Sequence, residues 1–504
     1  MSEAATAAWN ALAALPRPAL KDLFADPARV ADWSVRLDLP GGAIRFDWSK
    51  THLDAAHGAG FEALAEAVGF KARRAAMFAG EAINLTEGRA VLHTAQRGVG
   101  LDTACEEAFA LHLRMKSLVE AIHGGALGEV QHLIHIGIGG SALGPALALD
   151  ALTRDGAQVA VHVVSNIDGC ALEAACRACD PATTLIAVAS KTFTTTETMT
   201  NAESALAWLR DGGVADPYGR VVALTANPDK AVAWGVDETR VLPFPESVGG
   251  RYSLWSSIGF PVALALGWDD FAALLDGAAA MDRHFLETDG LANLPLRAAF
   301  ADLYYARLLG CQTRACFAYD ERLRLLPSYL QQLEMESNGK RVKADGSPVD
   351  GPTAPITWGG VGTDAQHAVF QLLHQGTHLV PVDFIAAIIP GDSLDPAHHQ
   401  SLLANCFAQG AALMAGKDAR DAARAYPGGR PSATILCEDI NPATLGALIA
   451  FHEHRTFANA VLMEINAFDQ FGVELGKDIA RSILGASASF DASTEALLAE
   501  AGIK

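Results

Sequence analysis

The feature that most constrains the fold is a series of short apolar segments that recurs from residue 131 onward. The gaps between them are long enough for crossover helices, and strands that alternate with helices form parallel sheets covered on both faces. The spacing therefore predicts an α/β domain whose ligands bind beyond the carboxyl ends of its strands. The segments are 132–138, 158–164, 184–189, 220–224 and 240–244.

A second alternating region follows a helical stretch around residues 271–309. Strand-like apolar runs again alternate with segments of helical periodicity along the chain. Because no low-complexity linker separates the regions, we expect a second α/β domain packed against the first. Its strand-like runs are 315–319, 379–389 and 433–437, and its helical segments are 364–375, 396–415 and 441–465.

The remaining chain is predicted to be mainly helical. Residues 33–48 are an exception, because two alternating runs flank a Pro-Gly-Gly turn and so predict a β-hairpin. We expect four segments: a mainly helical N-terminal wrapping with this hairpin (1–115), a first α/β domain (116–285), a second α/β domain (286–485) and a helical C-terminal tail (486–504).

Composition argues against several classes of partner. The 504 residues carry a formal net charge of −20, whereas a protein that binds the phosphate backbone of a nucleic acid needs an excess of Lys and Arg. The most apolar run, 133–149, is short for a membrane span and contains four glycines. The N-terminus lacks the basic region of a signal peptide. We therefore expect a cytoplasmic protein without nucleic-acid or membrane partners.

The cysteines do not form a metal motif. Eight of them are spread along the chain, and reduced thiols are the expectation for such a pattern. Cys176 and Cys179 form a C-x-x-C pair, but no second pair matches it, and residues 452–454 lack the spacing of H-E-x-x-H. We predict no metal site.

A glycine-rich segment, residues 134–145, is typical of an anion-binding turn. Its sequence, Ile-His-Ile-Gly-Ile-Gly-Gly-Ser-Ala-Leu-Gly-Pro, predicts a strand, a tight turn and a helix whose N-terminus attracts a phosphate. Gly137, Gly139 and Ala142 also satisfy the dinucleotide pattern G-x-G-x-x-A, with Asp168 as a candidate ribose-binding acid. This segment alone leaves both interpretations open.

Another strand end carries hydroxyl groups around one lysine. The apolar run 185–189 leads into Ser-Lys-Thr-Phe-Thr-Thr-Thr-Glu at 190–197. Thr194 and Glu197 have the spacing of a capping box, which predicts a helix start here. Hydroxyls, an ammonium group and free backbone N–H groups at such a turn make a phosphate cradle, together with Ser141 on a neighbouring strand end.

Three further residues suit proton-transfer chemistry. Arg251 follows two glycines beyond an apolar run and can stabilise developing negative charge. Glu336 is expected near the end of a short helix, on the same face as Gln332, where the helix dipole disfavours the carboxylate and so favours a general base. His367 falls in the first turn of another helix, where its neutral form is favoured.

Taken in order, these motifs resemble the glucose-6-phosphate isomerase (phosphoglucose isomerase) family. The resemblance implies two sugar-isomerase-type domains with flavodoxin-like sheets. It also implies an enzyme that interconverts glucose 6-phosphate and fructose 6-phosphate through an enediolate, in glycolysis and gluconeogenesis, without cofactor or metal. The segments that carry it are 80–93, 137–145, 190–197, 248–253, 334–340, 366–377 and 468–477.

The same resemblance implies roles for individual residues. Glu336 would move the proton between C1 and C2, and Arg251 would stabilise the enediolate. The family forms homodimers, so His367 is expected to act in the partner's site. The remaining implied roles are ring opening by His367 and Lys477, substrate contact by Gln332 and Gln470, and binding of the sugar phosphate by Gly140, Ser141, Ser190, Lys191, Thr192 and Thr195.

Alternatives remain at this stage. From the residues alone, Lys477 could form a surface ion pair with Glu474 at i, i+3. A dinucleotide oxidoreductase would explain residues 137–142 and Asp168, but not the hydroxyl cluster or Glu336. A non-catalytic sugar-phosphate sensor would keep the cradle and lack a positioned base, arginine and histidine, all of which this chain has.

Overall fold

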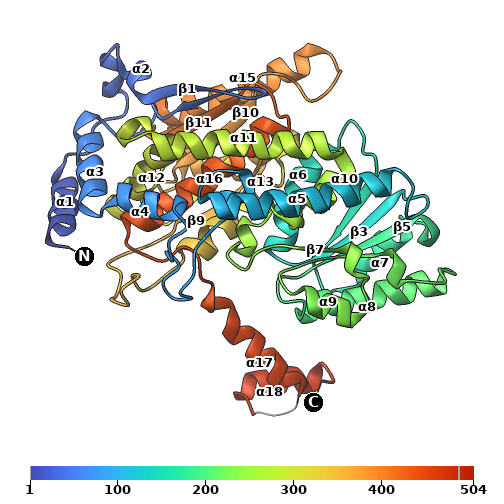
Figure 1. The fold of residues 1–504 in the computed structure, drawn as a ribbon. Coiled ribbons are helices and arrows are strands. Elements are labelled where there is room, and N and C mark those ends of the chain that lie inside the picture. The colour runs from blue at the N-terminus through green and yellow to red at the C-terminus, as the bar shows by residue number, and fades with distance from the viewer. Residues whose placement is uncertain (1, 486–488, 504) are drawn as a thin grey trace. The chain divides into compact units, whose positions relative to one another are not determined.

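Two β-sheets organise the first part of the computed structural model, which describes residues 2–485 and 489–503 (Figure 1). The chain divides into two compact units, Met1–Ala467 and Phe468–Lys504, and both sheets belong to the first unit. The predicted α/β class is confirmed. The division into four segments that the sequence suggested stays a prediction.

The first sheet has five parallel strands, at the positions that the apolar runs predict. Its order, β4-β3-β5-β6-β7, is the flavodoxin-like order, in which the direction of winding reverses between the first and third strands along the chain. The reversal lies between β3 and β5, so the loops after these strands flank a crevice for ligands. The strands are β3 (His132–Gly137), β4 (Ala160–Val164), β5 (Thr184–Ala189), β6 (Val221–Thr225) and β7 (Val241–Pro243).

Helices cover this sheet because its strands are apolar on both faces. On one face, Ile134 and Ile186 are buried together with Leu172 of α7 (Gly169–Arg177) and Leu206 of α8 (Thr196–Asp211). The other helices of this region are α5 (Asp102–His123), α6 (Gly140–Leu152), α9 (Pro228–Trp234) and α10 (Phe260–Leu266).

The second sheet has the order β1-β2-β11-β10-β8-β9. The last four strands are parallel, whereas the predicted hairpin, β1 and β2, adds antiparallel to β11. The N-terminal hairpin therefore completes a sheet formed by residues more than 250 positions later. The strands are β1 (Ser34–Leu39), β2 (Gly42–Asp47), β8 (Thr313–Tyr319), β9 (Ile356–Val361), β10 (Val382–Ala387) and β11 (Ser432–Cys437).

Strand β9 is absent from the sequence prediction, which expected residues 359–367 to open a helix. Glycine is unfavourable in strands, so Gly359 and Gly360 weaken the sequence signal. The structure shows why a glycine lies there: a Cβ added at Gly359 would lie 1.8 Å from the carbonyl oxygen of Cys316 on β8. The helix itself, α14 (Asp364–Gln375), begins after the strand.

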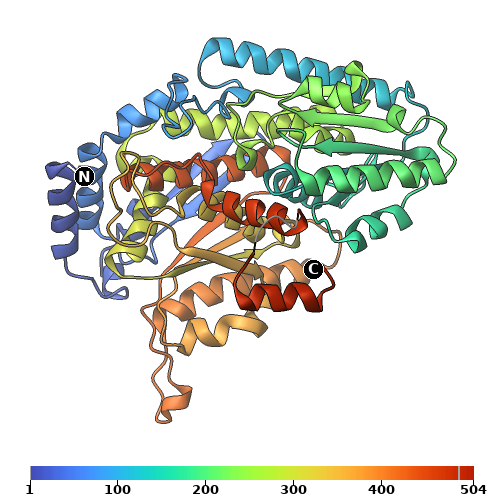
Figure 2. The same ribbon diagram turned by 90° about the horizontal axis from the view of Figure 1, so that it is seen from below.

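Helices pack on both faces of the second sheet. Phe370 of α14 and Leu413 of α15 (Pro396–Ala415) lie in one core with Phe384 of β10, and both helices are seen along this face in Figure 2. On the other face, the ring of Phe46 in β2 lies 4.7 Å from that of Phe451 in α16. Both predicted helices, 364–375 and 396–415, are confirmed.

The central helix, α16 (Pro442–Leu462), is buried along its whole length and packs against α11 (Trp268–Glu287) and α12 (Leu294–Leu303). Two glycines permit the close approach. A Cβ at Gly277 would lie 1.8 Å from the carbonyl oxygen of Ala443, and one at Gly446 would lie 2.0 Å from that of Leu274. Larger residues at either position would push the two helices apart.

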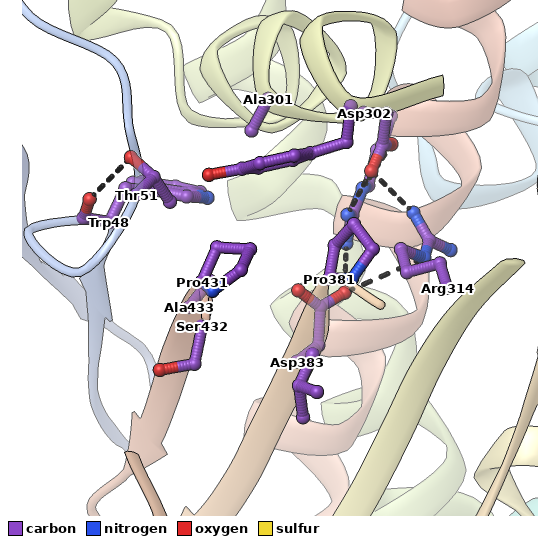
Figure 3. A pocket seen from close by; sticks show the side chains of 13 residues that line it. Trp48, Thr51, Ala301, Asp302, Arg314, Pro381, Asp383, Pro431, Ser432 and Ala433 are labelled. Atoms are coloured by element: carbon purple, nitrogen blue, oxygen red, sulfur yellow. Dashed lines mark hydrogen bonds and ion pairs between the residues drawn. The ribbon is translucent and has the colours of Figure 1, made fainter. Parts of the chain in front are cut away.

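A network of buried charges ties α12 and α16 to the second sheet (Figure 3). Asp302 on α12 accepts hydrogen bonds from Arg314 of β8 at 2.8 Å and from Arg455 of α16 at 2.7 Å. Arg455 also donates to Asp383 of β10 at 2.7 Å. A cavity of about 20 Å³ adjoins these groups.

The other described helices include the predicted N-terminal ones and two in the second unit. The second unit contains α17 (Glu474–Leu484) and α18 (Ala492–Glu500). Among the described residues, no helix is long and apolar enough to cross a membrane. The N-terminal helices are α1 (Glu3–Ala14), α2 (Arg29–Trp33), α3 (Ala55–Ala67) and α4 (Phe70–Phe78).

Candidate active site

The glycine-rich turn lies at the carboxyl end of β3 and begins α6. Gly139 has a φ of 58°, in the left-handed region that favours glycine, and occupies the N-cap position of the helix. A Cβ added at Gly140 would lie 2.1 Å from the carbonyl carbon of Gly250 and 2.5 Å from the backbone nitrogen of Arg251. The glycine therefore lets the segment that carries Arg251 lie directly against the start of α6.

The hydroxyl cluster lies beside this turn, at the carboxyl end of β5. Gly137 pairs with Ala189 in the sheet, so the two following loops leave from the same edge. The hydroxyl groups of Ser190 and Thr195 are hydrogen-bonded at 3.0 Å. The prediction that the glycine turn and the hydroxyl cluster occupy neighbouring strand ends is confirmed.

Two helix N-termini at this edge lack side-chain caps. The predicted capping box is wrong: α8 begins after Thr195, whose side chain makes no cap hydrogen bond, and the Thr194 hydroxyl donates to Thr192 at 2.8 Å. The N-cap of α6 is a glycine, which has no side chain to offer. In the first turn of α6 the N–H groups of Ser141 and Ala142 already donate to the carbonyl oxygens of Ile138 and Gly139. The uncapped first turn of α8 is therefore the better source of backbone donors for an anion, as in a phosphate site.

Lys191 adds a cation to the cradle. Its ammonium group donates hydrogen bonds to the carbonyl oxygens of Glu246 at 2.6 Å and Val248 at 3.2 Å. An ammonium group has three donors, so one remains for a ligand. Burial lowers the pKa of Lys191 to about 8, and the nearby Arg89 acts in the same direction.

Arg251 is buried and held in one orientation. It lies on the helical turn Gly250–Tyr252, with its side chain 2% exposed. Its Nε donates to the hydroxyl of Ser337 at 2.6 Å, and its Nη2 donates to the carbonyl oxygen of Ala467. The hydroxyl of Tyr252 lies 2.9 Å from that of Ser337 and completes this support. A fixed guanidinium suits stabilisation of charge that develops on a substrate oxygen.

Glu336 faces this guanidinium. Its Oε2 lies 3.6 Å from Arg251 Nη1, and its side chain is 20% exposed, so a ligand can reach the carboxylate. The predicted short helix is confirmed. Its first part, α13 (Leu326–Leu330), is α-helical and continues into a π-helix, Gln331–Glu336. π-helical turns occur frequently at functional sites.

The same π-helix brings Gln332 to the glycine turn. A Cβ at Gly139 would lie 3.0 Å from Nε2 of Gln332. Since Gly140 contacts the backbone of Arg251, and Arg251 faces Glu336, all five residues form one continuous cluster. Gln332, Arg251 and Glu336 thus meet at the glycine turn that begins α6.

Buried contacts hold the π-helix on both sides of Glu336. The Glu334 carboxylate forms an ion pair with Arg314 and accepts a hydrogen bond from Thr357 at 2.9 Å. Asn338 donates to the carbonyl oxygen of Thr456 at 3.0 Å. Sequence reasoning missed these supporting residues and Ser337, because no local pattern marks a polar side chain as buried.

The three other predicted residues belong to later segments of the chain. His367 is exposed in the first turn of α14, beside Gln366, which accepts a hydrogen bond from Tyr319 at 2.6 Å. Gln470 and Lys477 belong to the unit Phe468–Lys504. Within that unit, Lys477 Nζ lies 3.6 Å from Glu474 Oε1, which confirms the ion pair that the spacing suggested.

Comparison with known proteins identifies the family. A model of the phosphoglucose isomerase family matches residues 47–498, most of the chain. The chain belongs to the phosphoglucose isomerase family. The family that its motifs resemble is therefore confirmed, and the dinucleotide interpretation of the glycine turn loses its support. Asp168, the acid on which that interpretation depended, caps α7 by accepting a hydrogen bond from the backbone of Cys170 at 3.0 Å.

Relatives in this phosphoglucose isomerase family match along the whole chain. The glucose-6-phosphate isomerase of Novosphingobium aromaticivorans is 75% identical over 496 residues and is covered over 98% of each chain. That of Erythrobacter litoralis is 71% identical, with 100% of both chains covered. A crystal structure of a glucose-6-phosphate isomerase from Chlamydia trachomatis has a TM-score of 0.89 at 30% identity, covering 100% of this chain and 99% of that one.

Proposed function

We propose that this member of the phosphoglucose isomerase family interconverts glucose 6-phosphate and fructose 6-phosphate. The observation that carries the proposal is the accessible carboxylate of Glu336, which lies 3.6 Å from the fixed guanidinium of Arg251. An aldose-ketose isomerisation needs a base that moves a proton at the carbon next to a carbonyl and a cation for the oxygen that becomes charged. These two groups supply both.

The proposed cycle begins with the phosphate in the cradle. Ser141, Ser190, Lys191, Thr192 and Thr195 bind it, assisted by the uncapped N-terminus of α8 and by the positive end of the α6 dipole.

Bound in this way, the sugar directs its reacting carbons toward the carboxylate. Glu336 then removes a proton from C2 of the opened aldose and returns it to C1, while Arg251 stabilises the enediolate oxygen. Gln332 and Gln470 contact the substrate, and His367 and Lys477 assist ring opening.

The direct test is turnover by the purified full-length chain. We expect glucose 6-phosphate to be converted into fructose 6-phosphate, and the reverse, without added metal or nicotinamide. If the protein binds the sugar phosphate but converts none of it, the sensor function is correct instead. A change in nicotinamide absorbance on addition of sugar phosphate would favour the oxidoreductase.

Loss of the Lys191 proton should weaken substrate binding at alkaline pH. The Lys191 ammonium, with a pKa of about 8, pairs with the dianionic phosphate below that pH and loses its charge above it. Affinity for substrate should therefore fall as the pH rises, and KM should increase several-fold over the first pH unit above the pKa. Steady-state KM values measured across this range test the prediction.

The control for this prediction is Lys191→Arg, whose side chain stays charged throughout. Its KM should change little over the same range. An equal rise of KM in wild type and Lys191→Arg would show that another group sets the alkaline limit.

We also propose a homodimer in which His367 serves the partner's site. The exposed position of His367 supports this arrangement, because a histidine there is accessible to a second copy. Co-expressed Glu336→Gln and His367→Ala chains test it. In their heterodimer, one site carries both substitutions and the other carries neither, so random pairing should restore about a quarter of the wild-type rate.

If all residues of an active site came from one chain, the same mixture should give a different result. Each chain would then keep one defect at its own site, and the mixture would be no more active than the two variants assayed separately. Purification through two different affinity tags isolates the heterodimer and shows whether it forms at all.

A further inference from the structure

Three potential metal ligands meet at the first sheet, away from the phosphate cradle. His132 is the first residue of β3, His162 lies in β4, and Cys179 follows the end of α7. One ligand atom from each side chain lies within 4.8 Å of the other two. All three side chains are partly buried.

The sheet register explains why the two histidines meet. His132 pairs with Ala160, and His162 pairs with Ile134, so the histidines lie two positions apart on neighbouring strands. Because side chains alternate with a period of two, both project from the same face. Their ring centroids are 5.6 Å apart. Helix α7 packs on this face and delivers Cys179 at its C-terminal end.

The two imidazoles leave buried nitrogen atoms unsatisfied. Neither Nδ1 of His132 nor Nε2 of His162 has a hydrogen-bond partner among the described residues. A buried polar atom without a partner carries a desolvation cost and calls for an explanation such as an unseen ion.

We propose that His132, His162 and Cys179 bind one Zn²⁺ ion. Imidazole nitrogen and thiolate sulfur are the donors that zinc prefers, and tetrahedral zinc places its ligand atoms about 3.3–3.8 Å apart. Side-chain movements of about 1 Å bring the three atoms to this spacing. A water molecule fills the fourth position.

This proposal differs from the sequence prediction of no metal site. That prediction looked for a second cysteine pair to match Cys176 and Cys179. The fold instead supplies two histidines from different strands, and their meeting depends on a register that sequence spacing does not reveal.

The position of the site indicates a stabilising role. Strand β3 has His132 at its start and Gly137 at its end, about 17 Å apart in an extended strand. An ion at the starting edge lies too far from the cradle to contact a bound sugar phosphate. It would instead join β3, β4 and α7, and so raise the melting temperature of the full-length protein.

Co²⁺ is the first probe, because tetrahedral Co²⁺ absorbs visible light and a thiolate ligand adds a charge-transfer band. The full-length protein is reduced, stripped of metal with a chelator and titrated with Co²⁺. We expect saturation at one ion per chain, with both sets of bands, and displacement of Co²⁺ by Zn²⁺. A wild-type protein that shows neither set of bands would overturn the proposal.

Variants locate the site. Cys179→Ser should abolish the charge-transfer band and weaken Zn²⁺ binding at least tenfold. His132→Gln, at the start of β3, should weaken binding to a similar degree. Cys170→Ser is the matched control, because Cys170 is an exposed cysteine on the same helix and should bind Zn²⁺ as wild type does. Unchanged binding in folded Cys179→Ser and His132→Gln would contradict the assignment.

Discussion

Replacing Glu336 with glutamine should lower kcat for the isomerisation by about 10³-fold or more while leaving sugar-phosphate binding nearly unchanged. Glutamine has the size of glutamate, so the carboxamide can occupy the same position facing Arg251, where the carboxylate oxygen lies 3.6 Å from Nη1. It cannot accept a proton from carbon. Binding depends on the cradle at α6 and α8, which this substitution does not touch.

Two measurements separate chemistry from binding in this variant. A coupled assay gives kcat and KM, and titration with a phosphorylated sugar alcohol, which lacks the reacting carbonyl, gives the affinity of the cradle. Glu321→Gln is a suitable control, because Glu321 has an exposed carboxylate on the segment between β8 and α13 and should retain full activity. A Glu336→Gln enzyme within tenfold of the wild-type kcat would show that another group is the base.

Much of the fold follows from local sequence signals. Apolar runs predicted the positions of all five strands in the first sheet, because strands that are covered by helices are mostly apolar. The hairpin at β1 and β2 and the strand-like run of β11 were both predicted, but the pairing of β2 with β11 was not. Pairing between segments so far apart depends on the assembled core, and no local pattern encodes it.

The residues of the candidate site were likewise predictable only in part. Arg251 and the hydroxyl cluster could be singled out because each follows a strand, where ligands bind in parallel α/β folds, and Glu336 because it was expected at the end of a short helix. The groups that hold them could not. Nothing in the sequence distinguishes the buried Arg314, which supports the π-helix through Glu334, from an arginine on the surface.

The buried network around Asp302 should contribute strongly to stability, and we expect Asp302→Ala to lower the free energy of unfolding by about 3–5 kcal/mol. Asp302 accepts hydrogen bonds from Arg314, Arg455 and Asn459 at 2.8, 2.7 and 2.9 Å. Without it, the guanidinium groups of Arg314 and Arg455 keep only part of their compensation in a buried site. Denaturant unfolding of both proteins gives the difference.

This effect should depend on pH in a definite direction. Burial disfavours the charged form of Asp302, but Arg314 and Arg455 outweigh burial and hold the pKa of its carboxyl well below the usual range. A lowered pKa in the folded state stabilises the protein above the pKa of the unfolded chain, about 3.9 for aspartate, and this contribution is lost as the pH falls through the folded value. The difference between wild type and Asp302→Ala should therefore be complete at neutral pH and shrink in acid.

A surface ion pair provides the comparison that decides whether burial is the cause. Asp38 lies 3.2 Å from Arg36, but its side chain is 86% exposed. Asp38→Ala should therefore change the free energy of unfolding by less than about 1 kcal/mol. If Asp302→Ala cost no more than this, water entering the adjoining cavity of about 20 Å³ would have to replace the lost carboxylate (Figure 3). The two arginines would then be hydrated rather than held by a dry ionic network.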